Sequence, residues 1–119
     1  MYRSKIEGMR LVKKPEFVTL PAGTLYCELR EKWVFGELRL KGETISEDDY
    51  WVRELDWIDG DDPGEIFDRL EAMASDSSVS FPAPESYSRG GNFRDDTMFL
   101  VYERDDVVAL ITDLILPAT

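Results

Sequence analysis

Alternating apolar and polar positions mark two neighbouring strands in the first half of the chain. From Thr24 to Arg30, and again from Trp33 to Lys41, nearly every second residue is apolar, which is the period of a half-buried strand. The positions assigned to the buried face are Leu25, Cys27, Leu29, Val34, Gly36, Leu38 and Leu40. The two segments predict a hairpin that turns at Glu31-Lys32, although a tight primed turn prefers other residues.

The opposite face of this hairpin carries three aromatic side chains among its polar ones, Tyr26, Trp33 and Phe35. A large apolar patch on such a face is unusual unless a helix or a partner covers it. We expect helices of the same chain to cover it.

The segment from Ser46 to Ile58 fits two structures. Ser46 and Asp49 have the spacing of a capping box, and Trp51, Leu55 and Ile58 recur at helical intervals. The run from residue 50 to 52, Tyr-Trp-Val, favours a strand instead. We predict a third strand here.

Three helices and one more strand complete the pattern. A helical turn or two opens at Pro15 and closes at Leu20, and a longer helix begins at Asp62-Pro63 and ends near Ser75. Residues 97–102 form a continuous apolar run typical of a buried central strand. A last helix, capped by Asp105 or Asp106, runs until Pro117. The apolar stripes expected to pack inward are Ile66, Phe67, Leu70, Met73 and Ala74 in the longer helix, and Val107, Leu110, Ile111, Leu114 and Ile115 in the last.

These elements predict an α+β fold: a small antiparallel sheet of three or four strands packed by two main helices. We expect a single domain over residues 9–119, preceded by an N-terminal extension over 1–8. Residues 75–96 are rich in Ser, Pro and Gly and predict a long loop, a length uncommon in compact domains unless it is mobile or functional.

Composition excludes several kinds of chemistry. The 119 residues include no histidine and one cysteine, Cys27, so histidine-dependent triads, common zinc hydrolase sites, thiolate zinc clusters and internal disulfides are all ruled out. Cys27 lies on the apolar face of its strand, which indicates an inert core thiol. No apolar run is long enough to span a membrane, and we expect a cytoplasmic protein without a cofactor.

Charge is unevenly distributed along the chain. The formal net charge is -11, but residues 1–42 hold nine basic and five acidic groups, net +4, whereas residues 43–119 hold five basic and twenty acidic groups, net -15. Such a field repels nucleic-acid phosphates and anionic membranes and attracts cationic partners. Acidity that serves only solubility is the alternative.

Acidic residues gather in two places. Asp56, Asp59, Asp61, Asp62 and Glu65 could supply oxygen ligands to a divalent cation, but their spacing does not fit an EF-hand loop, and a solvated turn at a helix N-terminus explains them better. Asp95, Asp96, Glu103, Asp105 and Asp106 bracket the strand at 97–102. Paired carboxylates can perform acid and base catalysis when burial separates their pKa values.

The long loop carries residue types that are enriched at protein interfaces, Phe81, Tyr87, Arg89, Phe93 and Arg94. The alternative is that the loop folds its aromatic side chains back onto the core. Gly90-Gly91 matches neither the dinucleotide fingerprint nor the P-loop.

Two blocks carry a resemblance to known proteins: LPAGTLY with FGELRLKGET in residues 20–44, and FLVYERDDV in residues 99–107. They resemble a group of small uncharacterised proteins of bacteria and their phages. The resemblance implies no activity.

We therefore expect a non-enzymatic, acidic protein-binding module that engages a basic protein, as an inhibitor, immunity or anti-defence protein masking a nucleic-acid-binding surface does. The candidate partner-binding residues are Asp59, Asp61, Asp62, Tyr87, Arg89, Phe93, Asp105 and Asp106. A small enzyme that uses carboxylates or a divalent metal, and a subunit of a larger assembly, are the alternatives.

Overall fold

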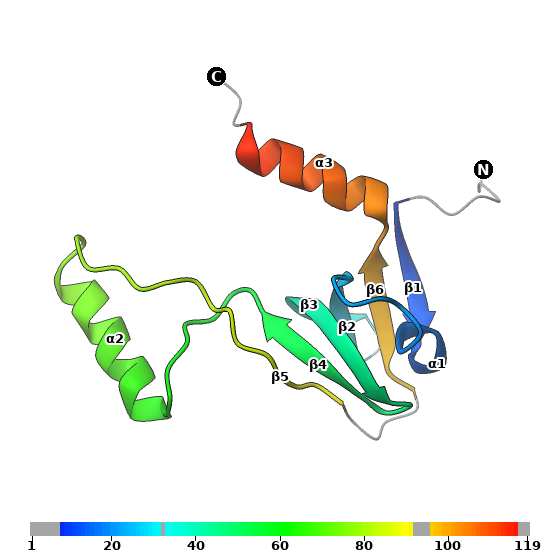
Figure 1. Cartoon of the computed structure of the whole chain (residues 1–119), viewed down its shortest axis with the longest axis horizontal. Helices are drawn as coiled ribbons and strands as arrows, with labels where there is room; N and C mark the ends of the chain where they lie inside the picture. The colour runs from blue at the N-terminus through cyan, green and yellow to red at the C-terminus, as the bar shows by residue number, and fades with distance from the viewer. Residues whose placement is uncertain (1–7, 32, 92–95, 117–119) are drawn as a thin grey trace.

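The computed structural model describes residues 8–31, 33–91 and 96–116 and contains one six-stranded antiparallel sheet in the order β1-β6-β2-β3-β4-β5 (Figure 1). The strands are β1 (Met9–Lys13), β2 (Leu25–Glu31), β3 (Val34–Ser46), β4 (Asp49–Glu54), β5 (Ser88–Arg89) and β6 (Met98–Tyr102). The helices are α1 (Lys14–Phe17), α2 (Pro63–Ser75) and α3 (Arg104–Ile115). No helix in these described ranges has both the length and the apolar character needed to cross a bilayer.

The predicted α+β class with an antiparallel sheet is confirmed, but the sheet is larger than the three or four strands expected. The two strands that the sequence pattern missed are β1 and β5, which form the two edges. Strand β1 pairs only with β6, about ninety residues later in the chain, as in Leu11 opposite Leu100. Strand β5 is two residues long and is defined only by its pairing with β4. Each of these short segments is a strand because it pairs with a strand distant in the sequence, and the local pattern of apolar and polar residues does not predict such pairing.

The predicted hairpin is present as β2 and β3, with Leu25 opposite Leu40 and Cys27 opposite Leu38. The ambiguous third segment is a strand, β4, over a shorter range than Ser46 to Ile58, and Ser46 instead ends β3. It is joined to β3 by a turn at residues 47–48.

One face of the sheet holds the aromatic core, and Tyr26 belongs to it, contrary to the polar face predicted for that residue. This aromatic face consists of Val12, Phe17, Tyr26, Tyr50, Val52, Phe99 and Val101, all buried. The short helix α1 supplies Phe17, which stacks on Phe99 at 4.0 Å between ring centroids and meets Tyr26 edge-on at 4.6 Å. A four-residue helix therefore seals this face.

Phe35 does not share a face with Tyr26, because register shifts after Cys27 and Leu29 bring Phe35 opposite Leu29. The expectation that helices cover Trp33 and Phe35 is also wrong, since both side chains are more than half exposed. Trp33 lies in the turn with a positive φ of 70°.

The other face of the sheet is a continuous apolar surface, which we call the leucine face. Cross-strand partners share a face, so the register assigns the positions on β1, β6, β2, β3 and β4. These are Met9, Leu11 and Lys13; Met98, Leu100 and Tyr102; Leu25, Cys27 and Leu29; Phe35, Leu38 and Leu40; and Trp51 and Arg53. Its centre, including Cys27, is buried, whereas positions nearer the edges such as Leu11 and Trp51 are exposed.

The two longer helices do not pack on either face, which corrects the prediction that their apolar stripes point inward. Over the described lengths of α2 and α3, no residue is buried. Both helices project from the sheet, α2 beyond the end of β4 and α3 beyond the end of β6 (Figure 1). Both helices have an apolar side, but neither packs that side against the sheet of its own chain.

Candidate functional site

The most distinctive surface is the segment that carries α2, residues 55–87, which we call the α2 arm. Its helix starts where predicted: the Asp62 carboxylate accepts a hydrogen bond from the Glu65 amide at 2.8 Å, and Pro63 occupies the first helical position. The Asp61 amide in turn donates to Glu65 at 3.2 Å. Asp61 and Asp62 are exposed and stand at the tip where the arm turns into α2.

The arm is held together by its own contacts. Arg69 donates to the Asp59 carbonyl oxygen and to the Glu65 carboxylate, both at 2.7 Å, and its guanidinium lies 4.9 Å from the centre of the Phe81 ring. The Asp59 carboxylate accepts hydrogen bonds from the Glu85 amide at 3.0 Å and from the Ser86 hydroxyl at 2.9 Å. These bonds, first of all the one from the Glu85 amide, lower the pKa of Asp59 below its ordinary value.

Asp59 therefore fastens the returning loop to the base of α2. It was predicted as a partner-binding residue, and the structure shows it engaged within the arm. Phe81 likewise lies within the arm, on Arg69 of α2, and not on the core as the alternative for the loop aromatics expected.

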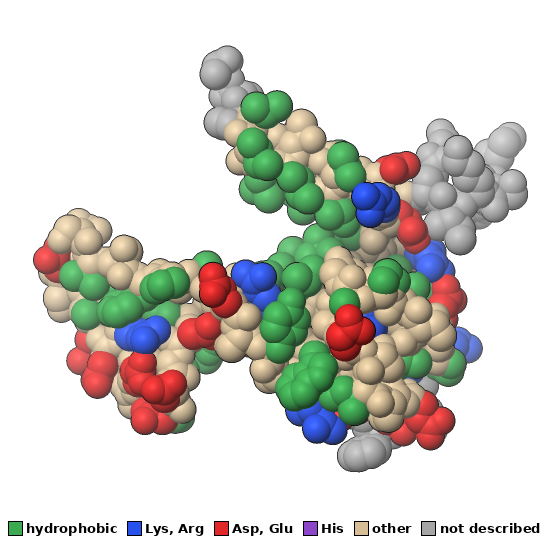
Figure 2. Space-filling view, in the orientation of Figure 1, with side chains coloured by type: hydrophobic (Ala, Val, Ile, Leu, Met, Phe, Trp, Pro, Cys, Tyr) green, Lys and Arg blue, Asp and Glu red, His purple; other side chains and the backbone are tan. Residues whose placement is uncertain are grey.

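The arm presents acidic and apolar side chains together. Residues 56–76 contain eight acidic groups and one basic group, net -7 of the chain's -11. Figure 2 shows Asp and Glu side chains gathered on the lower side of the α2 arm and hydrophobic ones above them. Phe67 is 65% exposed on the helix itself, and Trp57 and Leu70 are also exposed. The arm is thus an amphipathic acidic element with both surfaces open to solvent.

The second predicted cluster, Asp105 and Asp106, lies in the first turn of α3. The helix begins at Arg104 and its cap residue Glu103 makes no side-chain capping bond, so the predicted cap at Asp105 or Asp106 is wrong. Asp105 is exposed, whereas Asp106 is half-buried near Gly8. The cluster therefore belongs to the junction of β6 and α3, apart in the fold from the α2 arm (Figure 1).

Tyr87 and Arg89 lie together at the β4–β5 edge. The Tyr87 ring comes within 3.1 Å of where a Cβ on Gly42 would stand, so glycine is required for this close approach. Tyr87, Gly42 and Trp51 line an open hollow of about 490 Å³. Arg89 forms an ion pair with Asp49 and lies 5.7 Å from the centre of the Trp51 ring.

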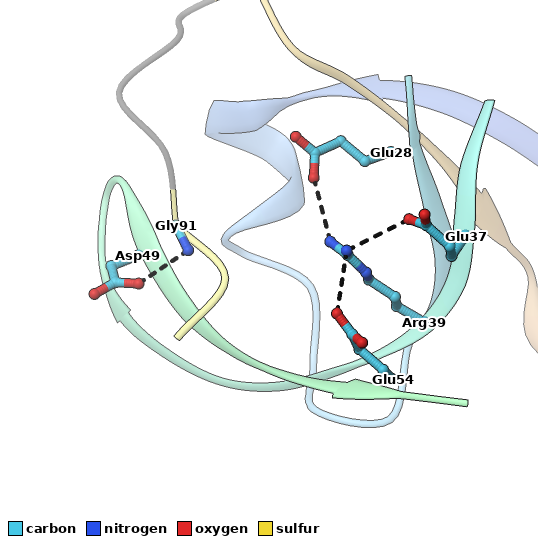
Figure 3. A network of polar contacts seen from close by, with 6 residues as sticks. All are labelled: Glu28, Glu37, Arg39, Asp49, Glu54 and Gly91. Atoms are coloured by element: carbon cyan, nitrogen blue, oxygen red, sulfur yellow. Dashed lines mark hydrogen bonds and ion pairs between the residues drawn. The ribbon is translucent and has the colours of Figure 1, made fainter. Parts of the chain in front are cut away.

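Asp49 organises this edge. It also accepts a hydrogen bond from the Gly91 amide at 3.1 Å (Figure 3). The Arg89 hydrogen bond is the main cause of the lowered pKa of Asp49. Phe93, the remaining predicted contact, lies outside the described residues.

A polar network that the sequence pattern did not reveal surrounds Arg39. Its guanidinium is directed between three carboxylates, at 3.3 Å from Glu54, 3.5 Å from Glu37 and 3.7 Å from Glu28 (Figure 3). Alternation alone places Arg39 among outward-facing residues, and the burial of the opposite residue Tyr26 is what draws it inward.

This network closes one end of the aromatic face and does not resemble a catalytic pair. Its four members come from three adjacent strands, and one cation lies among three anions at distances typical of surface ion pairs, which leaves a formal net charge of -2. The buried hydroxyls of Tyr26 and Tyr50 have no hydrogen-bond partner among the described residues, and burial raises the pKa of both. Within the described parts of the chain, no group of three or more metal-ligating side chains is arranged to hold an ion.

Comparisons with family models, with curated proteins and with solved structures find no match to this chain.

Proposed function

We propose that the chain is a non-enzymatic protein-binding module that engages a basic partner protein through the α2 arm. The observation that carries the proposal is that α2 exposes a dense acidic surface beside the aromatic side chain of Phe67, with no residue of the helix buried against the rest of the chain. Amphipathic helices that lie in a partner's groove use this combination.

The two surfaces of α2 have separate roles. Carboxylates such as Asp68 and Glu71 attract a basic surface from a distance and set its orientation, since complementary charge acts mainly on the association rate and on specificity. Phe67 and Leu70 supply apolar area for a pocket on the partner, where a few large side chains dominate the binding energy.

A basic surface with an apolar pocket is a common feature of proteins that handle nucleic acids. We therefore infer a role of the inhibitor, immunity or anti-defence kind, in which the acidic arm masks such a surface in the cytoplasm. The negative charge makes direct binding of nucleic acid or of an anionic membrane unfavourable. Asp61 and Asp62 extend the acidic surface, while Asp59 maintains its shape through the Glu85 and Ser86 bonds.

The test is capture from host lysate with immobilised protein at about 50 mM and about 500 mM salt, because screening shortens the range of charge attraction. Wild type is compared with the double variant D68N/E71Q and with F67A. The matched control is E43Q/E47Q, which removes two exposed carboxylates, one near the end of β3 and one in the turn that follows it.

We expect one basic protein to be retained by wild type and by the control at low salt and released at high salt. The affinity of that protein should fall about two- to thirtyfold in D68N/E71Q, as the loss of two exposed ion pairs worth about 0.2–1 kcal/mol each predicts. It should fall more than fivefold in F67A, since an interface hot spot contributes above about 1 kcal/mol. Equal retention by all four proteins, or retention that salt does not change, refutes the proposal.

A further inference from the structure

Helix α3 has the composition of an interior helix and the exposure of a surface one. Between Asp106 and Asp113 it carries no charged residue, and its apolar side chains cover more than one side of the helix. Figure 2 shows these hydrophobic side chains along α3, where Ile111 is 47% and Leu114 72% exposed. A helix that is apolar nearly all round is stable only when other elements cover it.

The leucine face of the sheet is also apolar, and no helix in the described parts of the same chain packs against it. Twelve of its fourteen assigned positions are apolar, and the helix that packs closely against the strands, α1, lies on the aromatic face instead. An antiparallel sheet tolerates one solvated face when that face is polar, which this one is not. Each chain therefore carries an exposed apolar helix and an apolar sheet face whose outer positions, Met9, Leu11, Phe35 and Trp51, are exposed.

The two surfaces are prevented from meeting within one chain by the connection between them. Glu103 is the one residue between the end of β6 and the start of α3. Its amide donates to the Gly8 carbonyl oxygen at 3.1 Å, and its carboxylate bonds to Arg10. Because these bonds hold both the amide and the carboxylate of Glu103, α3 leaves the sheet at the end of β6 rather than folding back over it (Figure 1).

We infer that α3 docks on the leucine face of a second copy of this chain, whose own α3 docks in return. A two-fold axis makes the contact reciprocal, as in most homodimers, so that one association covers both helices and both sheet faces. The 12 residues of α3 span about 18 Å, close to the length of the five- to seven-residue strands β1, β2 and β6 at about 17–23 Å.

Charge favours a second copy as the occupant. The two charged positions of the leucine face, Lys13 and Arg53, are both basic. Apart from Arg104 at its first position, α3 carries only acidic charges, at Asp105, Asp106 and Asp113. The contact of α3 with the leucine face of a second copy therefore brings opposite charges together, although the chain as a whole is acidic. This inference involves α3 and the sheet, and does not depend on the function proposed for α2.

The experiment measures the mass of the full chain by light scattering after gel filtration, over about a hundredfold range of chain concentration. The variant is L114K, which places a cation at a 72% exposed position facing the basic charges of the sheet. The matched control is F67K, which makes the same change at a 65% exposed position of α2. Circular dichroism checks that both variants are folded.

A second variant reports independently on the sheet. L11E places an anion at a 41% exposed position of the leucine face, where it would meet the acidic charges of α3. We expect wild type and F67K to have twice the 13.7 kDa chain mass, and L114K and L11E to have the mass of one chain. Circular dichroism checks the fold of L11E as well.

Three results overturn the inference. A wild type that has the mass of one chain at every concentration has no second copy on the leucine face. A dimer that L114K leaves intact is held by other surfaces. Conversion of L114K but not of L11E to single chains shows that α3 pairs with α3 and not with the sheet.

Discussion

Replacing Phe17 by alanine tests whether a four-residue helix closes the core. Phe17 is fully buried, and its ring contacts three other aromatic rings of the aromatic face at centroid distances of 4.0–5.0 Å. Helix α1 has too few residues to be stable by itself, so its position depends on this side chain. Loss of Phe17 removes both the apolar area and the lid of the aromatic face.

The expected cost is about 3–5 kcal/mol in the free energy of unfolding, the range for removing a buried phenylalanine and leaving its cavity. A domain of this size is stable by only about 5–15 kcal/mol, so F17A loses a large fraction of that stability. At about 4 °C per kcal/mol, its melting temperature should fall by roughly 12–20 °C.

The assay is urea unfolding followed by tryptophan fluorescence, with wild type and variants at one chain concentration because association contributes to apparent stability. The control is F67A, which removes the same side chain from a position 65% exposed on α2. We expect F67A to change stability by less than about 0.5 kcal/mol. A loss below about 1 kcal/mol in F17A, or equal losses in the two variants, would falsify the assignment of Phe17 to the core.

Three further predictions concern the buried tyrosines and the α2 arm. Burial raises the pKa of Tyr26, so the folded protein keeps a proton that the unfolded chain releases above about pH 10, and stability should fall as the pH rises past that value. Y26F should reduce this alkaline loss, measured by unfolding at several pH values. At pH 7 it should change the free energy of unfolding by under about 1 kcal/mol, since no hydrogen bond is lost. Asp62→Ala should cost about 1 kcal/mol and speed amide exchange in the first turn of α2, whereas Asp68→Ala should do neither. Asp59→Asn weakens the bonds to Glu85 and Ser86, so limited proteolysis of residues 76–87 should be faster than in wild type. Because folding lowers the pKa of Asp59, wild type should become equally sensitive only as the pH falls through the acid range. Equal proteolysis rates of the two proteins at neutral pH would contradict this role.

Local chemistry determined the elements whose signals lie within a few residues. The Asp62-Pro63 start of α2 and the β2–β3 hairpin are where the sequence places them, because capping and alternation act between near neighbours. Cys27 is buried as a free thiol, as its apolar neighbours indicated. Histidine-dependent chemistry is excluded by composition alone, because the sequence contains no histidine.

Contacts between distant residues decided the rest. Strand β1 exists because β6 pairs with it, and Tyr26 is buried because Phe17 from α1 packs over a face that alternation marks as polar. The Arg39 network follows from the same burial and has no signal in the linear sequence.

Periodicity shows that α2 and α3 each have an apolar side, but it does not show what that side contacts. The direction in which each helix leaves the sheet is a tertiary property. Glu103, bonded to Gly8 and Arg10, holds the start of α3. Arg53 of β4 holds the α2 arm by donating a hydrogen bond to the Pro84 carbonyl oxygen at 2.9 Å. Those directions leave both helices exposed, and from that exposure come the proposed binding surface on α2 and the inferred contact of α3 with a second copy.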